Sequence, residues 1–384
     1  MAPTTEEQRL LHQTVREFAR DEVRPHAAAW DREGRFPSEI VPRLAALGLL
    51  GMTIPTEHGG AGLDMMAVAT AIEALAWGDA GLALAVASHN SLCAGHIVAF
   101  GDEAQRRRFL PRLGSGEALG AWCLTEPGAG SDAAAIKTRA ERRGDRWVLN
   151  GSKVFVTQGS VGGVYVVMAV SGPGTGRAGI SAFVVERGTP GLEIGRKEDK
   201  LGVRSSDTAE VRFTDCDVPD ANRLGPAGDG HRQAMRVLER GRIGIAAMAV
   251  GIGRAALDAS LAYARQRVAY GRPIADLQII QFMLADMATE LDAAWLLTER
   301  AAEHADRGEP FRREASMAKL YASEAAARAA TKAVQIHGGY GFIKDYPVER
   351  FYRDIKLCEI GEGTSEVQRA IISRAVLEGG GGPR

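Results

Sequence analysis

The spacing of apolar residues changes twice along the chain and divides it into three zones. In the first zone, from about residue 4 to 118, Leu11, Val15 and Phe18 recur at helical intervals and fall on one face. This helix is predicted to run to about Asp31, and Pro and Gly residues separate several further helices after it. The first zone is therefore predicted to be helical.

The second zone, from about 119 to 224, contains short runs of β-branched and aromatic residues interrupted by Gly and Pro. The runs 147–149 and 153–157 flank Asn150-Gly151, a dipeptide that suits a type I′ turn, so together they predict a β-hairpin. Further strands are expected at 164–170, 180–185 and 211–213. This zone is predicted to form a small β domain.

Helical spacing returns in the third zone. Long helical segments are expected near 228–267, 276–306, 311–337, 347–357 and 365–377, with short connections that favour a bundle. The predicted fold class is α+β: an N-terminal helical domain (1–118), a middle β domain (119–224) and a C-terminal four-helix bundle (225–384).

Composition excludes several classes of protein. The 384 residues carry a formal net charge of -1, without the basic excess of a nucleic-acid binder or membrane-surface protein. The longest small-apolar run, 243–253, is shorter than a bilayer span, and the N-terminus does not resemble a signal peptide. Four scattered cysteines with no CxxC pair fit reduced thiols, so we expect a cytoplasmic protein.

Two motifs suggest chemistry that their context does not support. His89, Cys93 and His96 share a helical face and offer three zinc ligands, but no fourth ligand is evident, so we predict no metal site. GIGRAA (251–256) matches a dinucleotide-binding turn, yet a helical run precedes it where a strand is required. Its glycines are instead expected to allow two helices to approach closely.

Two glycine-rich loops are stronger candidates. TEPGAGSD (125–132) opens the β zone, and its backbone N–H groups could converge on an anion such as a pyrophosphate. IHGGYGF (336–342) lies between two predicted helices. Each loop, taken alone, also fits a simple turn.

The third candidate is a single carboxylate. Glu362 lies between Gly361 and Gly363, and Thr364 or Ser365 can cap the helix that follows, with Gln368 three residues after Ser365 in the position of a capping box. Glycines on both sides allow the backbone to approach a ligand closely. A carboxylate in such a crowded, apolar place has a raised pKa and can act as a base. The alternative is a solvated acidic residue before a well-capped helix.

Six motifs in order across about 240 residues together resemble the acyl-CoA dehydrogenase family, most closely its short-chain branch. They are TEPGAGSD, KEDKLGVRSSDT, RVAYGRPI, QFMLADM, QIHGGYGF and IGEGTSEVQ. The resemblance covers essentially the whole chain. It implies FAD as the cofactor, an acyl-CoA substrate, a homotetramer, and transfer of electrons to an electron-transfer flavoprotein.

The resemblance also implies roles for individual residues. Those expected to bind FAD are Trp122, Leu124, Thr125, Gly130, Ser131, Phe155, Val156, Thr157, Arg267, Gln278, Gln335, Gly338, Gly339, Thr364 and Glu366. Those expected to line the substrate and CoA cleft are Ser131, Leu238, Glu239, Arg242 and Gly363. Arg267, Gln278 and the 335–339 segment are expected to hold the adenine end of FAD, partly across a subunit interface.

Glu362 falls on the catalytic base of the family. It is expected to take the α-proton of the thioester while the β-hydrogen leaves as hydride to flavin N5, which gives a trans-2-enoyl-CoA. The Glu362 backbone N–H and a ribityl hydroxyl are expected to hydrogen-bond the thioester oxygen, and loss of one such donor costs roughly 3–4 kcal/mol.

Two positions bear on this assignment. Some branches of the family place the base near residue 241, but Gly241 leaves no carboxylate there, and Glu239 is in register with an acidic residue on the substrate side. Many relatives carry an aromatic residue immediately before the base, where this chain has Gly361, so acyl chain length is left open. An oxidase that passes electrons to oxygen, and a flavin-free helical scaffold, are the alternative functions.

Overall fold

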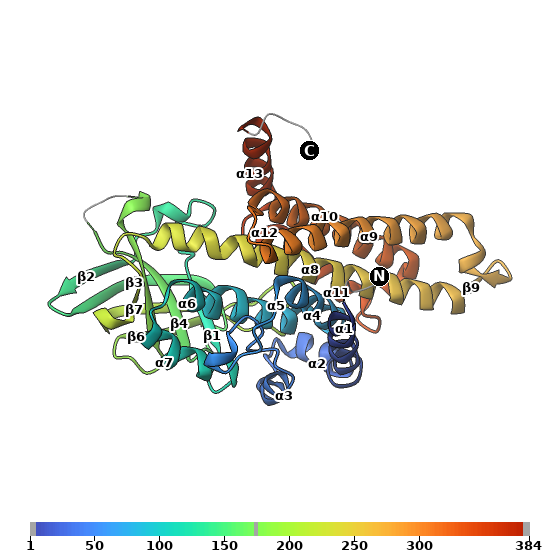
Figure 1. Cartoon of the computed structure of the whole chain (residues 1–384). Coiled ribbons are helices and arrows are strands. Elements are labelled where there is room, and N and C mark those ends of the chain that lie inside the picture. The colour runs from blue at the N-terminus through green and yellow to red at the C-terminus, as the bar shows by residue number, and fades with distance from the viewer. Residues whose placement is uncertain (1–4, 173–175, 379–384) are drawn as a thin grey trace.

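Helices at one end of the molecule and a β-sheet at the other are joined by one long helix (Figure 1). The computed structural model describes residues 5–172 and 176–378, so residues 1–4 of the first zone, 173–175 of the middle zone and 379–384 of the third zone lie outside the described part. The first zone forms helices, as expected. They are α1 (Glu6–Phe18), α2 (Arg24–Glu33), α3 (Val41–Ala46), α4 (Met65–Gly78), α5 (Ala80–Ala87), α6 (Gly95–Phe100) and α7 (Glu103–Gly114). A π-helical turn (Ala19–Val23) joins α1 to α2.

α4 and α5 form the centre of the N-terminal core, and every residue of both is buried. Helices that are apolar on all sides are stable only inside a protein. Each begins at an aspartate whose side chain accepts a backbone hydrogen bond: Asp64 from Ala67 N at 2.7 Å, and Asp79 from Leu82 N at 2.8 Å. Local sequence therefore fixes where these core helices start.

The middle zone is a twisted sheet with the order β6-β7-β3-β2-β4-β5-β8, and β1 pairs with β4. Its strands are β1 (Gly120–Cys123), β2 (Arg139–Arg143), β3 (Arg146–Thr157), β4 (Val164–Val170), β5 (Ile180–Glu186), β6 (Leu192–Lys197), β7 (Thr208–Pro219) and β8 (Arg223–Leu224). The predicted strand 164–170 is confirmed, whereas β1, β2, β6 and β8 were not predicted. Most of the side chains of the neighbouring strands β1, β4 and β5 are buried.

The predicted hairpin at Asn150-Gly151 is wrong. Both residues lie inside the single strand β3, and the hairpin turn is at Gly144-Asp145, since Arg143 pairs with Arg146. Gly151 has φ 147°, and the pairing register with β7 shifts between Leu149 and Gly151. Glycine at this position therefore makes a β-bulge rather than a turn.

The third zone is built on three long helices: α8 (Gly230–Gln266), α9 (Gln278–Asp306) and α10 (Arg312–His337). Two-residue strands β9 (Val268–Ala269) and β10 (Arg272–Pro273) form a hairpin between α8 and α9. The predicted segment 347–357 is two short helices, α11 (Val348–Asp354) and α12 (Lys356–Ile360). The last helix, α13 (Ser365–Glu378), packs on α10 and projects from the bundle (Figure 1).

The glycines of GIGRAA bring helices together, as predicted. A Cβ on Gly251 would lie 2.8 Å from the Cβ of Ala76 in α4, and one on Gly253 would lie 3.2 Å from the Cβ of Ala326 in α10. These glycines therefore allow α8 to approach both neighbours closely, and the sequence around them is helical rather than a nucleotide-binding turn.

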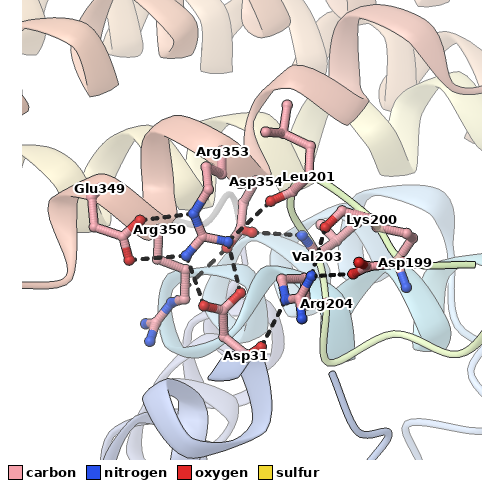
Figure 2. A network of polar contacts seen from close by, with 10 residues as sticks. All are labelled: Asp31, Asp199, Lys200, Leu201, Val203, Arg204, Glu349, Arg350, Arg353 and Asp354. Carbon is pink, nitrogen blue, oxygen red and sulfur yellow. Dashed lines mark hydrogen bonds and ion pairs between the residues drawn. The ribbon is translucent and has the colours of Figure 1, made fainter. Parts of the chain in front are cut away.

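A polar network fixes the three zones relative to one another (Figure 2). The Arg353 guanidinium of α11 donates to both carboxylate oxygens of Asp31 in α2, at 2.9 and 2.7 Å, and to the Leu201 carbonyl at 3.0 Å. Val203 N donates to Asp354 Oδ1 at 2.6 Å. The KEDKLGVRSSDT motif thus anchors a loop of the β zone against helices from both other zones. One of these helices, α11, is close in sequence to Glu362.

Two helical stretches, Ala80–Phe100 and Gly230–Gln266, are long and apolar enough to span a membrane by length and composition. Their apolar windows are 78% and 67% buried within the described structure, as in core helices. These two stretches are therefore weak evidence for membrane spans.

Candidate active site

Glu362 lies in the short loop between α12 and α13, and its backbone is left-handed. Its φ is 54°, and that of Gly363 is 98°. Left-handed backbone is uncommon and costly for a residue with a side chain, so the surrounding structure must hold it there. Among the described residues, the backbone N–H of Glu362 has no hydrogen-bond partner. The loop therefore presents both a carboxylate and a free N–H.

Burial controls the acidity of this carboxylate. Oε2 of Glu362 is inaccessible and has no hydrogen-bond partner in the described part of the chain, although the residue as a whole is half-buried. Burial raises the pKa of Glu362 to about 7, against the opposing effects of the cations Arg242 and Lys319. A carboxyl group with a pKa near neutrality can hold and release a proton at physiological pH.

The Glu362 carboxylate packs directly on the Gly241 backbone in α8. A Cβ on Gly241 would overlap Oε2 and would lie 2.8 Å from Cδ of Glu362. The position where some family branches carry the base is therefore occupied here by the carboxylate of Glu362 itself.

α8 also brings the expected substrate-side residues to this loop. Arg242 is only 4% exposed, burial lowers its pKa, and its Nε and Nη1 are buried without partners in residues 5–172 and 176–378. Burial raises the pKa of Glu239, whose Oε1 lies 3.6 Å from Nε of Arg312. Leu238 packs against the core beneath. Unpaired buried donors beside an unpaired carboxylate are typical of a site that awaits a polar ligand.

The two expected flavin-ring segments are adjacent in the structure. Val154 N of β3 donates to the Thr125 carbonyl at 2.9 Å. Nζ of Lys153, fully buried, donates to the Leu124 carbonyl at 3.0 Å and to Oε1 of Glu126 at 2.8 Å. Glu126 also accepts from Lys137 N and Thr138 N. This buried ion pair, which sequence reasoning missed, fixes the TEPGAGSD loop on β3.

The surface that these segments present fits a flat aromatic ring. Phe155 is 65% exposed with φ 57°, an outward-facing aromatic side chain on strained backbone. Nothing lies within 4 Å of a Cβ on Gly128 or Gly130, and Ser131 is exposed next to them. Large exposed apolar groups beside open backbone are typical of ligand sites. The residues present therefore fit a flavin.

The other residues of these segments differ in exposure. Trp122 is largely buried, and its Nε1 donates to Nδ1 of His96 at 3.1 Å. Val156 is 2% exposed and packs in the sheet core, so only its backbone can face a cofactor, whereas Thr157 at the end of β3 is half-buried.

A second group of expected FAD residues lies at the far end of the bundle. Arg267, Gly338 and Gly339 line a cavity of about 480 Å³, in which Tyr263 stacks on His337 at 4.2 Å. Gln335 and Gln278 are exposed nearby, at the end of α10 and the start of α9.

The second group of residues lies far from the candidate base along the same chain. Arg267 follows Arg242 by 25 residues along α8, which corresponds to about 37 Å of helix. This separation fits the expectation that adenine is held by a second subunit.

The helix after Glu362 has one of the two predicted caps, but not the predicted capping box. Thr364 caps α13, with its Oγ1 accepting from Val367 N at 3.3 Å. The capping box of Ser365 and Gln368 is not formed, because Nε2 of Gln368 donates instead to the Gly363 carbonyl at 2.9 Å. Glu366, also expected at the FAD site, is exposed on the first turn.

The residues considered as zinc ligands have other partners, and among the described residues no group of three or more His, Cys, Asp or Glu side chains could hold a metal. His89 bonds the Leu50 carbonyl and Gly120 N, both at 2.9 Å. His96 bonds Gln233 at 3.0 Å as well as the Trp122 indole. Both histidines are therefore satisfied core residues.

Comparisons with known proteins agree with this geometry. The N-terminal, middle and C-terminal domain models of acyl-CoA dehydrogenase match residues 5–117, 121–216 and 228–377. The chain belongs to the acyl-CoA dehydrogenase family. It has the three-domain fold of that family and is an FAD-dependent oxidoreductase that acts on acyl-CoA thioesters.

Similarity to individual proteins extends over nearly the whole chain. The mitochondrial short-chain specific acyl-CoA dehydrogenase of Homo sapiens is 47% identical over 97% of this chain and 90% of its own length. Butyryl-CoA dehydrogenase from Megasphaera elsdenii superposes with a TM-score of 0.96 at 41% identity, over 98% of this chain and 100% of its own. A chain in a structure described as the electron transferring flavoprotein of Acidaminococcus fermentans gives a TM-score of 0.96 at 42% identity, covering 97% and 98%.

Proposed function

We propose that this protein oxidises short- to medium-chain acyl-CoA thioesters to trans-2-enoyl-CoA, with Glu362 as the catalytic base. One observation carries the proposal: Oε2 of the Glu362 carboxylate is buried without a partner, in a loop that also offers a free N–H. The similarity to short-chain and butyryl-CoA dehydrogenases supports the substrate class.

The role of Glu362 follows from the chemistry of the substrate. The α C–H of a thioester is a weak acid, so its removal requires stabilisation of the enolate oxygen as well as a base. The Glu362 N–H supplies one preorganised donor to that oxygen, worth roughly 3–4 kcal/mol in comparable sites. The carboxylate takes the α-proton, and its raised pKa keeps its basicity close to what neutral pH requires. Arg242 balances the negative charge nearby.

FAD, when bound, accepts the β-hydrogen as hydride and so supplies the redox chemistry. The residues proposed to hold its ring and ribityl portion are Trp122, Leu124, Thr125, Gly130, Ser131, Phe155, Val156, Thr157, Thr364 and Glu366. Those proposed to hold the adenine portion of a partner's FAD are Arg267, Gln278, Gln335, Gly338 and Gly339. Leu238, Glu239, Arg242, Ser131 and Gly363 are proposed to line the substrate cleft.

The assembly is proposed to be a homotetramer. Large apolar side chains are exposed together at the end of the bundle that carries the β9–β10 hairpin: Val268, Tyr270, Ile279, Phe282 and Phe342, each more than half exposed. Exposed apolar groups on this scale are typical of subunit interfaces. The cysteines of the described chain are all free and buried, which supports a reducing, cytoplasmic location.

Electrons are proposed to pass to an electron-transfer flavoprotein. The test is anaerobic addition of butyryl-CoA to the yellow, FAD-loaded protein, which should bleach the flavin band. Reoxidation by an electron-transfer flavoprotein but not by air supports a dehydrogenase, and rapid peroxide formation indicates the oxidase. A preparation that takes up no FAD contradicts the proposal. A bound flavin that stays oxidised after butyryl-CoA is added contradicts it as well.

A further inference from the structure

A buried lysine with no assigned role lies directly beneath the loop of the candidate base. Lys319 of α10 is 0% exposed, and its Nζ donates to the Gly363 carbonyl at 2.6 Å. Charged side chains are almost never fully buried unless they are paired or perform a task. Lys319 makes no ion pair within 4 Å in the part of the chain that the structure describes. The main polar contact of this cation is therefore the loop itself.

The contact falls on the strained part of the backbone. Glu362 and Gly363 are two consecutive residues with left-handed backbone, and the Gly363 carbonyl lies at the end of this pair. It accepts a second hydrogen bond from Nε2 of Gln368 at 2.9 Å, so one side chain from α10 and one from α13 converge on the same oxygen. Hydrogen bonds from a charged donor are about twice as strong as neutral ones. Such bonds can hold a backbone conformation that would otherwise relax.

Lys319 also acts on Glu362 through its charge. The charged and titratable groups that face it are Cys358 and Glu359 of α12, Glu362 of the loop, and Arg242 of α8. Burial lowers the pKa of Lys319 to about 8, and it remains largely protonated at neutral pH. A cation close to a buried carboxylate favours the ionised form of that carboxylate.

We propose that Lys319 is a positioning residue for the reaction: it holds the left-handed turn that aims Glu362, and its charge favours the form of Glu362 that accepts a proton. Lys319 acts through the loop rather than on the substrate. This inference rests on the proposed function, in which Glu362 is the base.

The test compares Lys319→Met, which keeps the length and removes donor and charge, with the wild type. Flavin reduction by butyryl-CoA is measured by anaerobic stopped flow across pH on FAD-loaded protein. The rate constant at saturating substrate should fall at least about tenfold, since small misplacement of a reacting group is costly. The concentration for half-maximal rate should change less than about twofold, and the acidic limb of the pH profile should move upward by half a unit or more.

Two further variants separate the contributions. Gln368→Leu removes the neutral donor to the same carbonyl and should lower the rate while leaving the pH profile in place. Lys356→Met removes an exposed lysine, paired with Glu359, from the neighbouring helix and should change neither quantity, because exposed charges are screened. A rate and pH profile of Lys319→Met equal to those of the wild type overturn the proposal.

A readout without substrate keeps this test separate from that of the proposed function. Hydrogen exchange at the amides of Val367 and Gln368, which close the first turn after the loop, should accelerate in Lys319→Met. If wild-type flavin is not reduced by butyryl-CoA, the proposed function fails, while unchanged exchange overturns the positioning role. Should Lys319→Met not accumulate as a folded flavoprotein, Lys319→Gln takes its place. If neither variant binds FAD, the lysine serves folding and the proposal falls.

Discussion

The carboxylate of Glu362 occupies the space where a side chain on Gly241 would lie. A Cβ there would overlap Oε2 and lie 2.8 Å from Cδ, so a side chain at 241 would have to displace the carboxylate of Glu362. The two positions therefore depend on each other, because the observed position of the Glu362 carboxylate requires that residue 241 carry no side chain.

Gly241→Ala should displace the Glu362 carboxylate and lower the rate constant of flavin reduction by about tenfold or more. Gly244→Ala on the same helix is the matched control, because its Cβ would lie at ordinary distances of 3.7 Å from Ala87 and 3.9 Å from Ser91. It should keep its activity and gain about 0.5–1 kcal/mol of stability from better helix propensity. Equal activity of the two variants would show that the overlap does not matter.

The glycines that flank Glu362 should respond differently to alanine. Gly363 has φ 98°, and its Cβ would lie 2.7 Å from Nε2 of Gln368, so Gly363→Ala should cost about 1–2 kcal/mol of stability and much of the activity. Gly361 has φ −64°, and its Cβ would lie 3.4 Å from the Leu357 carbonyl, so Gly361→Ala should fold normally. Thermal unfolding and flavin reduction measure both effects. A Gly363→Ala protein as stable and active as Gly361→Ala would contradict the assigned strain.

Removal of the lysine in the pair that fixes the TEPGAGSD loop should destabilise the protein. Lys153→Met leaves Glu126 buried at 7% exposure without its cation, and breaking such a pair typically costs 3–5 kcal/mol. FAD affinity should fall with it, because Lys153 also holds the Leu124 carbonyl. The double variant with Glu126→Gln should recover part of the stability. Denaturant unfolding and flavin titration test this, and a Lys153→Met protein as stable as the wild type would exclude a structural role for the pair.

Glu362→Gln should be more stable than the wild type at pH 8 and nearly equal to it at pH 4.5. Burial raises the pKa of Glu362 from 4.5 to about 7, so within this window the folded state holds a proton that the unfolded chain releases. Stability of the wild type therefore falls as pH rises through the window, by on the order of 1–3 kcal/mol relative to glutamine. Melting temperatures of both proteins across pH measure this difference. A constant difference from pH 4.5 to 8 would show that Glu362 titrates normally.

Sequence reasoning located elements where local pattern and tertiary burial agree. The strand 164–170 is apolar throughout and buried in the sheet, so its boundaries were predicted correctly. The hairpin turn predicted at Asn150-Gly151 was wrong, because this dipeptide forms a turn only where the chain reverses direction. Pairing with β7 on one side keeps β3 extended here. The π-helical segments Ala19–Val23 and Ser88–Ala94 left no signal in apolar spacing.

The residues of the candidate site also divide into those that the sequence reveals and those that only the fold reveals. Glu362 could be found because two glycines around a carboxylate are unusual in sequence. Lys319 and Lys153 could not, since a lysine in an alanine-rich helix or a strand ordinarily has a solvated ammonium group. Only the fold shows that both are buried, and that each donates to the carbonyl of a loop with a predicted function.

The most direct test of the account is single-turnover reduction of bound flavin by butyryl-CoA in Glu362→Gln. This variant should bind FAD and acyl-CoA, since glutamine has nearly the same shape, but it should lose bleaching by several orders of magnitude because the amide cannot accept the α-proton. The wild type should bleach, with a rate that rises with pH through about 7, where Glu362 loses its proton. Retention of wild-type bleaching in a flavin-loaded Glu362→Gln protein would contradict the assignment of Glu362 as the base.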